Sequence, residues 1–213
     1  MRTLLGVVPP NLPLAPQQYE GRYQEAFNNV LRLYFNRLNT SLQTVFGPNG
    51  GQYIEFPYGS FYDTTTQTAA STTVAYPITL NTTALTNGVS VQSNSQITVD
   101  QSGLYNIQLS VQLSNLDTAP QDIDIWFRLN GTDITDSNSR FGLAARKNPS
   151  DPFHVVGALN FFQTMNADDY IQLYWCTTNT NAKIEYYSAP SSPTRPAIPS
   201  VIVTVTFVSS IET

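Results

Sequence analysis

The stretch that decides the fold is Ile97-Thr-Val-Asp-Gln-Ser-Gly-Leu-Tyr-Asn-Ile-Gln-Leu-Ser-Val-Gln-Leu113. It contains two blocks in which apolar and polar residues alternate, separated by a Ser102-Gly103 turn. Successive side chains of a β-strand point to opposite faces, so this alternation predicts strands with one face in a core and the other facing water. Alternation of this length is typical of antiparallel sheets.

The chain beyond residue 57 continues in the same manner. Alternating or apolar runs are separated by turn sequences such as Asn87-Gly88 and Asn130-Gly131, and no helical pattern intervenes. The β region opens with an aromatic segment over 53–62 and a polar strand or edge over 63–68. We expect further strands over 74–80, 89–92, 97–99, 104–116, 123–129, 140–146, 155–165, 170–177, 182–187 and 200–208. The prediction is a mainly β chain with an antiparallel β-sandwich of the jelly-roll type over 58–213. Its last strand carries no charge, so we expect it in the centre of a sheet, between the first strand and the 104–116 strand.

A helical pattern precedes the strands. Apolar residues recur at intervals of three and four, at Tyr23, Phe27, Val30, Tyr34, Leu38, Leu42 and Val45. This spacing predicts an amphipathic helix over 17–46, and the linker over 47–57 opens with the helix-terminating run Gly47-Pro-Asn-Gly-Gly51. The apolar stripe packs either on the chain's own β domain or on copies of the same helix. The Gly-rich break favours the second, a short bundle that serves as a self-associating stalk.

Residues 1–16 form a proline-rich apolar arm. Its four prolines exclude a helix, and the segment is expected to be extended. The arm either folds back on its own domain or docks as an anchor in a groove on another protein. The stalk that follows favours the anchor, whose apolar residues are Leu4, Leu5, Val7, Val8, Leu12 and Leu14.

Composition excludes several classes of function. The net charge is −5 and only 12% of residues are charged, so the basic patch that nucleic acid requires is not expected. Cys176 is the only cysteine, which excludes an intrachain disulfide and a thiolate metal cluster. No run approaches the roughly 18 apolar residues of a membrane span, and the apolar start is too short for a signal peptide. We expect a soluble, non-secreted chain without membrane insertion.

Residues with catalytic or ligand-binding chemistry are sparse. His154 is the only histidine, and we interpret it as a structural residue or loop contact. Two aspartate pairs, Asp122 with Asp124 and Asp168 with Asp169, leave open a glycan-cleaving site or a Ca²⁺ site, but no dense acidic loop accompanies them. We therefore predict no catalytic residue, no cofactor and no metal ion.

Two loops are candidates for contacts. Arg140, Arg146 and Lys147 either pair with aspartates across a subunit interface or remain solvated. The proline-rich segment that contains Tyr186, Tyr187 and Arg195 is the candidate receptor loop, since tyrosine beside serine is how many binding surfaces are built. A rigid linker into the last strand is the alternative.

Three motifs follow one another along the predicted sandwich: Gly103-Leu-Tyr-Asn-Ile-Gln-Leu109, Trp126-Phe-Arg-Leu-Asn-Gly131 and Met165-Asn-Ala-Asp-Asp-Tyr-Ile-Gln-Leu173. They resemble the G-x-Y strand, the R-x-N-G hairpin and the G-D-x-V-x-L strand of the C1q/TNF-like trimeric jelly roll. One departure is the run Asn166-Ala-Asp-Asp169, where the wider family often has glycine before the aspartate. The run from Tyr58 to Val205 is similar to a C1q-like domain of tailed-bacteriophage virion proteins, and the helical segment 19–38 resembles the stalk of that group.

This resemblance implies a homotrimer in which the jelly rolls pack around a threefold axis beside the helical stalk. It implies a non-enzymatic virion protein, a tail- or neck-associated fibre held by its N-terminal arm to other proteins of the tail, neck or capsid. The head is then expected to contact a host surface glycan or protein. The alternatives are a capsid decoration or head-fibre protein and, from another class, a glycan depolymerase that uses the aspartates named above.

Overall fold

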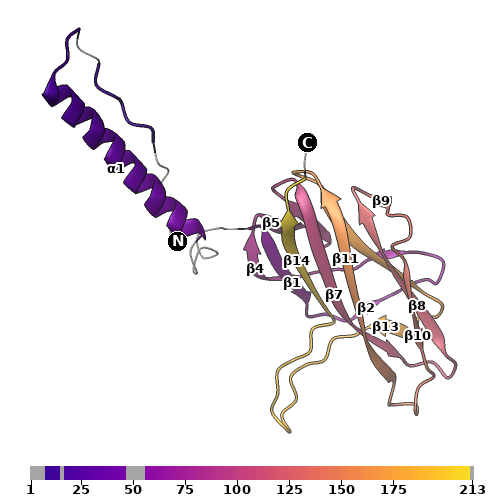
Figure 1. Ribbon diagram of the computed structural model, residues 1–213. Coiled ribbons are helices and arrows are strands. Elements are labelled where there is room, and N and C mark those ends of the chain that lie inside the picture. Colours follow the sequence, from indigo (N-terminus) through magenta and orange to yellow (C-terminus); the bar gives the residue numbers. More distant parts are fainter. Residues whose placement is uncertain (1–7, 15–16, 47–55, 212–213) are drawn as a thin grey trace. The chain divides into compact units, whose positions relative to one another are not determined.

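The structure is a computed structural model that describes residues 8–14, 17–46 and 56–211. The chain divides into two compact units, Met1–Glu55 and Phe56–Thr213. The first holds one helix and the second holds the strands (Figure 1). The chain is therefore mainly β with an N-terminal helix, as predicted.

The helix α1 extends over Gly21–Phe46, so it begins later than the predicted start at residue 17. None of its residues is buried. The extended segment 8–14 runs back alongside the helix (Figure 1). Val8 and Pro10 share a hollow with Val30 and Tyr34. In the described part of the chain, no helix has both the length and the hydrophobicity needed to cross a bilayer.

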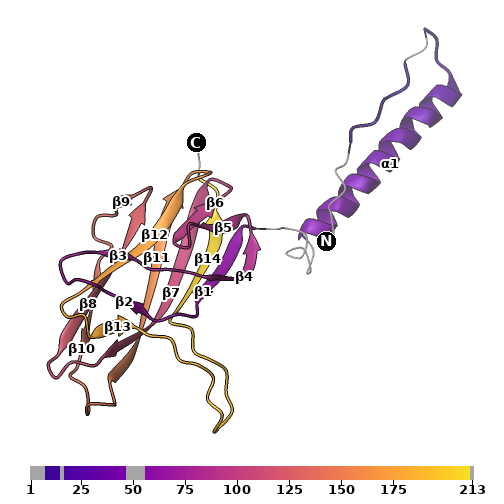
Figure 2. The same cartoon turned by 180° about the vertical axis from the view of Figure 1, so that it is seen from behind.

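The second unit consists of two antiparallel sheets, which we call sheet A and sheet B (Figure 2). Sheet A has the order β4 (Thr82–Asn87), β1 (Tyr58–Asp63), β14 (Val201–Ser209), β7 (Gly103–Asn115) and β11 (Phe153–Met165), with β13 (Ala182–Ile184) and β2 (Gln67–Thr68) continuing beside one end of β7. Sheet B has the order β5 (Val89–Gln92), β6 (Gln96–Val99), β12 (Tyr170–Thr177), β8 (Gln121–Leu129) and β10 (Ser139–Leu143), with β3 (Tyr76–Pro77) on β12 and β9 (Thr132–Asp133) on β8.

The strand pairs are nested in the sequence. The first strand, β1, pairs with the last, β14; inside this pair, β6 pairs with β12, β7 with β11, and β8 with β10. Consecutive pairs of this series alternate between sheet A and sheet B. These four pairs form a nested antiparallel series that spans both sheets.

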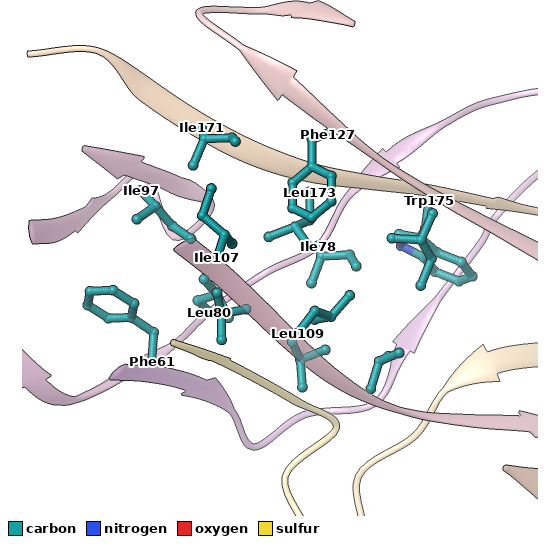
Figure 3. Packing of buried hydrophobic residues seen from close by; sticks show 14 of the residues in the cluster. Phe61, Ile78, Leu80, Ile97, Ile107, Leu109, Phe127, Ile171, Leu173 and Trp175 are labelled. Atoms are coloured by element: carbon teal, nitrogen blue, oxygen red, sulfur yellow. The ribbon is translucent and has the colours of Figure 1, made fainter. Parts of the chain in front are cut away.

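The core lies between the two sheets. The alternating residues of β7 place Tyr105, Ile107, Leu109, Val111 and Leu113 in it, each almost fully buried, as the sequence predicts. Figure 3 shows Phe61 and Ile107 of sheet A packed near Ile97 and Ile171 of sheet B. Burial of this apolar surface is the main favourable contribution to the folding free energy.

Several predicted strands differ in extent. The last strand lies between β1 and β7, as predicted. By contrast, only Tyr76 and Pro77 of the 74–80 run pair with a strand, and the predicted strand over 140–146 ends at Leu143. The strand over 82–87 was missed because it is a polar edge strand with no buried residue, so it carries no apolar pattern.

Candidate functional site

The strongest candidate site lies beside the loop that joins β13 to β14. Figure 1 shows this loop, in yellow, projecting from one end of the strands. Its base is closed by two backbone hydrogen bonds, in which the N–H of Tyr187 donates to the carbonyl of Ile198 (3.0 Å) and the N–H of Ile198 donates to the carbonyl of Tyr187 (2.8 Å). The backbone at the foot of the loop is therefore held in a fixed position.

A hollow of about 420 Å³ opens between this loop and sheet A, and we call it the loop hollow. Two of its lining residues come from sheet A and the others from the loop. They are Gln112 of β7, His154 of β11, and Tyr187, Ser188, Pro190, Arg195, Pro196 and Ile198. The lining thus combines one formal positive charge with polar groups and an apolar wall.

A chain of hydrogen bonds connects three side chains at the edge of the hollow. The phenol of Tyr187 donates to Oε2 of Glu185 (2.8 Å), and its oxygen lies 2.6 Å from Nδ1 of His154. Burial, followed by the hydrogen bond and the charge of Glu185, raises the pKa of Tyr187 well above its usual value. The phenol stays protonated, and its O–H donates a hydrogen bond to the carboxylate of Glu185. The phenol has no second hydrogen, so Nδ1–H of His154 is the donor to the phenol oxygen. This arrangement fixes the Tyr187 and His154 rings.

The structure brings together only part of the predicted receptor loop. Tyr187 and Arg195 line the loop hollow, whereas Tyr186 does not, and its backbone N–H donates to Oγ1 of Thr66 (3.1 Å). His154 contacts the loop through Tyr187. Sequence reasoning missed Gln112, whose only signal was its position on the polar side of the alternating strand.

The predicted stalk and anchor residues are on the first unit. Of the stripe, Tyr23, Phe27, Val30, Tyr34, Leu38 and Val45 are half-buried, and Leu42 is exposed. The rings of Tyr23 and Phe27 stack with centroids 6.1 Å apart. In the arm, Val8 and Leu14 are 80% and 95% exposed and Leu12 is also exposed. Leu4, Leu5 and Val7 lie outside the described residues.

One aspartate of each predicted pair has structural partners. Both oxygens of Asp124 accept from the guanidinium of Arg140, at 2.8 and 2.9 Å, so this arginine pairs within the chain. Asp169 lies in a turn, where it accepts from the side chain of Asn130 (2.7 Å) and the backbone N–H of Asn166 (2.7 Å). Among the described residues, no three His, Cys, Asp or Glu side chains are placed to hold a metal ion.

The remaining residues that the sequence analysis singled out lie at a strand end, in a turn or in loops. Asp122 is half-buried at one end of β8, and Asp168 occupies a turn with a positive φ of 68°. Lys147 pairs weakly with Asp151 (3.7 Å), and Arg146 donates to the carbonyl of Leu116 (3.4 Å). These contacts lie within the chain and give these residues structural roles.

Sheet A also has a face that points away from the core, which we call the outer face. Its residues form three rows across β11, β7, β14 and β1: Phe162, Asn106, Thr206 and Tyr58; Asn160, Gln108, Thr204 and Ser60; Ala158, Ser110, Ile202 and Tyr62. Its centre contains a hollow of about 370 Å³. Phe162, Ile202, Tyr58 and Val156 expose apolar surface on this face. Among the described residues, the row-forming side chains carry no charge, which is unusual for a solvated surface.

Comparison with protein-family models and with curated proteins finds no match for this chain.

Proposed function

We propose that this chain is a structural protein of a bacteriophage particle. It is a homotrimeric tail- or neck-associated appendage, anchored by its N-terminal arm, whose head contacts the host surface. The assignment to a virion rests on the sequence resemblance of the stalk and head described above. Two apolar surfaces carry the proposal: the half-buried stripe of α1 and the exposed outer face of sheet A, whose rows hold no charge.

The head of this appendage is a jelly roll. Its defining feature is an antiparallel hairpin wound into two sheets, and the nested pairing of β1 with β14, β6 with β12, β7 with β11 and β8 with β10 supports it. The order of strands within each sheet follows from that nesting.

The trimer assembles through the outer face and the helical stripe. Phe162 and Ile202 on the outer face would be removed from water by a neighbouring copy. The long strand β11 pairs only with β7 among the described strands, so its other edge is free for coverage by a neighbour. Along α1, the half-buried stripe from Tyr23 to Val45 gives three parallel helices a continuous apolar seam.

A second candidate is capsid decoration, in which the head covers or projects from the shell. The loop hollow favours an appendage whose head contacts the host over capsid decoration, because a decoration protein has no need of a concave site on its head. A glycan depolymerase is disfavoured, since the Arg140 guanidinium occupies both oxygens of Asp124 and so removes one of the two carboxylates that such a site would need.

The number of copies per purified particle tests this function. Quantitative mass spectrometry against the major capsid protein should return a few to a few tens of copies, in multiples of three, for a tail or neck appendage. Hundreds of copies would identify capsid decoration, and absence from the particle would refute both assignments. Light scattering on the full chain at micromolar concentration should return the mass of a trimer, and a monomer mass would refute the assembly.

A further inference from the structure

We infer that the loop hollow binds an acidic saccharide, with the guanidinium of Arg195 holding the carboxylate of a sugar residue. This inference rests on the proposed function, because it names the chemistry of the host-surface ligand.

The charge in the hollow is positive and not neutralised. Arg195 lines it, no carboxylate does, and within the described part of the chain Arg195 takes part in no ion pair. The nearby carboxylate of Glu185 already accepts the phenol proton of Tyr187. A guanidinium matches a carboxylate geometrically, through two parallel N–H donors. The free arginine therefore indicates an anionic ligand, although the chain as a whole has a net charge of −5.

The remaining lining fits a pyranose ring. Gln112 and Ser188 provide an amide and a hydroxyl that can donate to and accept from sugar hydroxyls. Pro190, Pro196 and Ile198 provide an apolar wall against which the C–H face of a sugar can pack. Inorganic phosphate would use Arg195 alone and leave the rest of the hollow unfilled. A volume of about 420 Å³ is in the range of small-molecule sites.

The foot of the loop is held in place before a ligand arrives. Tyr187 is fixed by Glu185 and His154 through side-chain hydrogen bonds, and by Ile198 through the backbone. A site that is already ordered loses little conformational entropy on binding. This favours a small rigid ligand over a long segment that must itself become ordered.

The test is calorimetric titration of the full chain with trisaccharides of galacturonate, glucuronate and mannuronate, and with the matched neutral trisaccharides. We expect at least one uronate to bind and its neutral counterpart to bind at least ~tenfold more weakly, because charge-assisted hydrogen bonds dominate. Arg195→Gln should reduce uronate affinity by the same factor. The matched control Lys147→Gln removes one exposed positive charge from another loop and should retain binding.

Four results would overturn the inference. The first is that no uronate binds, and the second is that the neutral trisaccharides bind as tightly as the uronates. The third is that Arg195→Gln and Lys147→Gln lose the same amount of uronate affinity. The fourth is that a short peptide with a free C-terminal carboxylate binds more tightly than both its C-terminal amide and the uronates. A change of the monomer–trimer midpoint in Arg195→Gln would also contradict it, since this would mean that a neighbouring copy fills the hollow. A failure of the proposed function gives a different result, in which the chain is absent from the particle but still binds uronates.

Discussion

Replacement of Phe162 by aspartate tests whether the outer face of sheet A is the surface on which the copies pack. Phe162 is 53% exposed in one copy and lies on β11, at the edge of that face that is free among the described strands, where it pairs with Asn106 of β7. The substitution alters neither the core nor the backbone pairing, because the side chain points away from the other sheet. Any loss of assembly therefore reports on the face itself.

The magnitude follows from the exposed area. A phenylalanine side chain buries roughly 200 Å² when fully enclosed, so about 100 Å² remains for a neighbouring copy to cover. At about 25 cal/mol per Å² this contributes about 2.5 kcal/mol per copy and about 7.5 kcal/mol per trimer. One decade in a dissociation constant corresponds to about 1.4 kcal/mol, and the midpoint concentration of a trimer varies as the square root of that constant. The midpoint should therefore rise about 500-fold.

The assay is light scattering or mass photometry of the full chain over a dilution series. Val74→Asp is the matched control, because Val74 has a similar exposed fraction of 48% but lies in a loop outside sheet A. Circular dichroism should show the same strand content in both variants. An unchanged midpoint in Phe162→Asp, or an equal shift in Val74→Asp, would refute the assignment of the outer face.

Three further predictions concern stability and reactivity. Ile107→Ala should lower the free energy of unfolding by about 2–5 kcal/mol because Ile107 is fully buried, while Gln101→Ala, in an exposed turn, should change it by less than about 0.5 kcal/mol, as measured by urea denaturation. Cys176 should react slowly with a thiol reagent at neutral pH and rapidly after denaturation, because burial, and then the charge of Asp124, raises its pKa; rapid reaction of the folded chain would contradict this. The pKa of Asp117 is lowered, mainly by the backbone N–H of Ala119, so this aspartate stabilises the fold above its unfolded pKa near 4 and loses that contribution as the pH falls through its lower folded value. Asp117→Asn should therefore show a smaller loss of stability between pH 5 and pH 2 than the unaltered chain, in thermal unfolding experiments at each pH.

The fold class could be predicted because its signal is local. Alternation over 97–113 determines which face of each strand enters the core, and the buried residues of β7 are those that the alternation indicates. The position of the last strand followed from its Val- and Thr-rich, uncharged sequence, which favours a buried place between two other strands. These inferences need no knowledge of which strands are partners.

The candidate site could not be predicted in this way. It combines Gln112 and His154, on paired strands of sheet A, with Arg195 in a loop distant along the chain. No local sequence pattern specifies that this loop lies beside these strands. The hydrogen bond between His154 and Tyr187 depends on the same approach. A histidine at the start of an apolar strand has the same appearance in the sequence whether it lies at a site edge or in a core.

Three copies of the loop hollow would act together on a host surface. Gln112 and His154 lie on β7 and β11, the strands that carry the outer face, so assembly through that face would bring the hollows of neighbouring copies to one end of the trimer. A single shallow saccharide site binds weakly, but linked sites that engage one polymer gain affinity by roughly 10²–10⁴ without any new contact. Variants that dissociate the trimer, such as Phe162→Asp, should therefore reduce attachment to a uronate-bearing surface far more than they reduce the affinity for a soluble trisaccharide. Equal losses in the two measurements would mean that each head binds alone and that the trimer has a purely structural purpose.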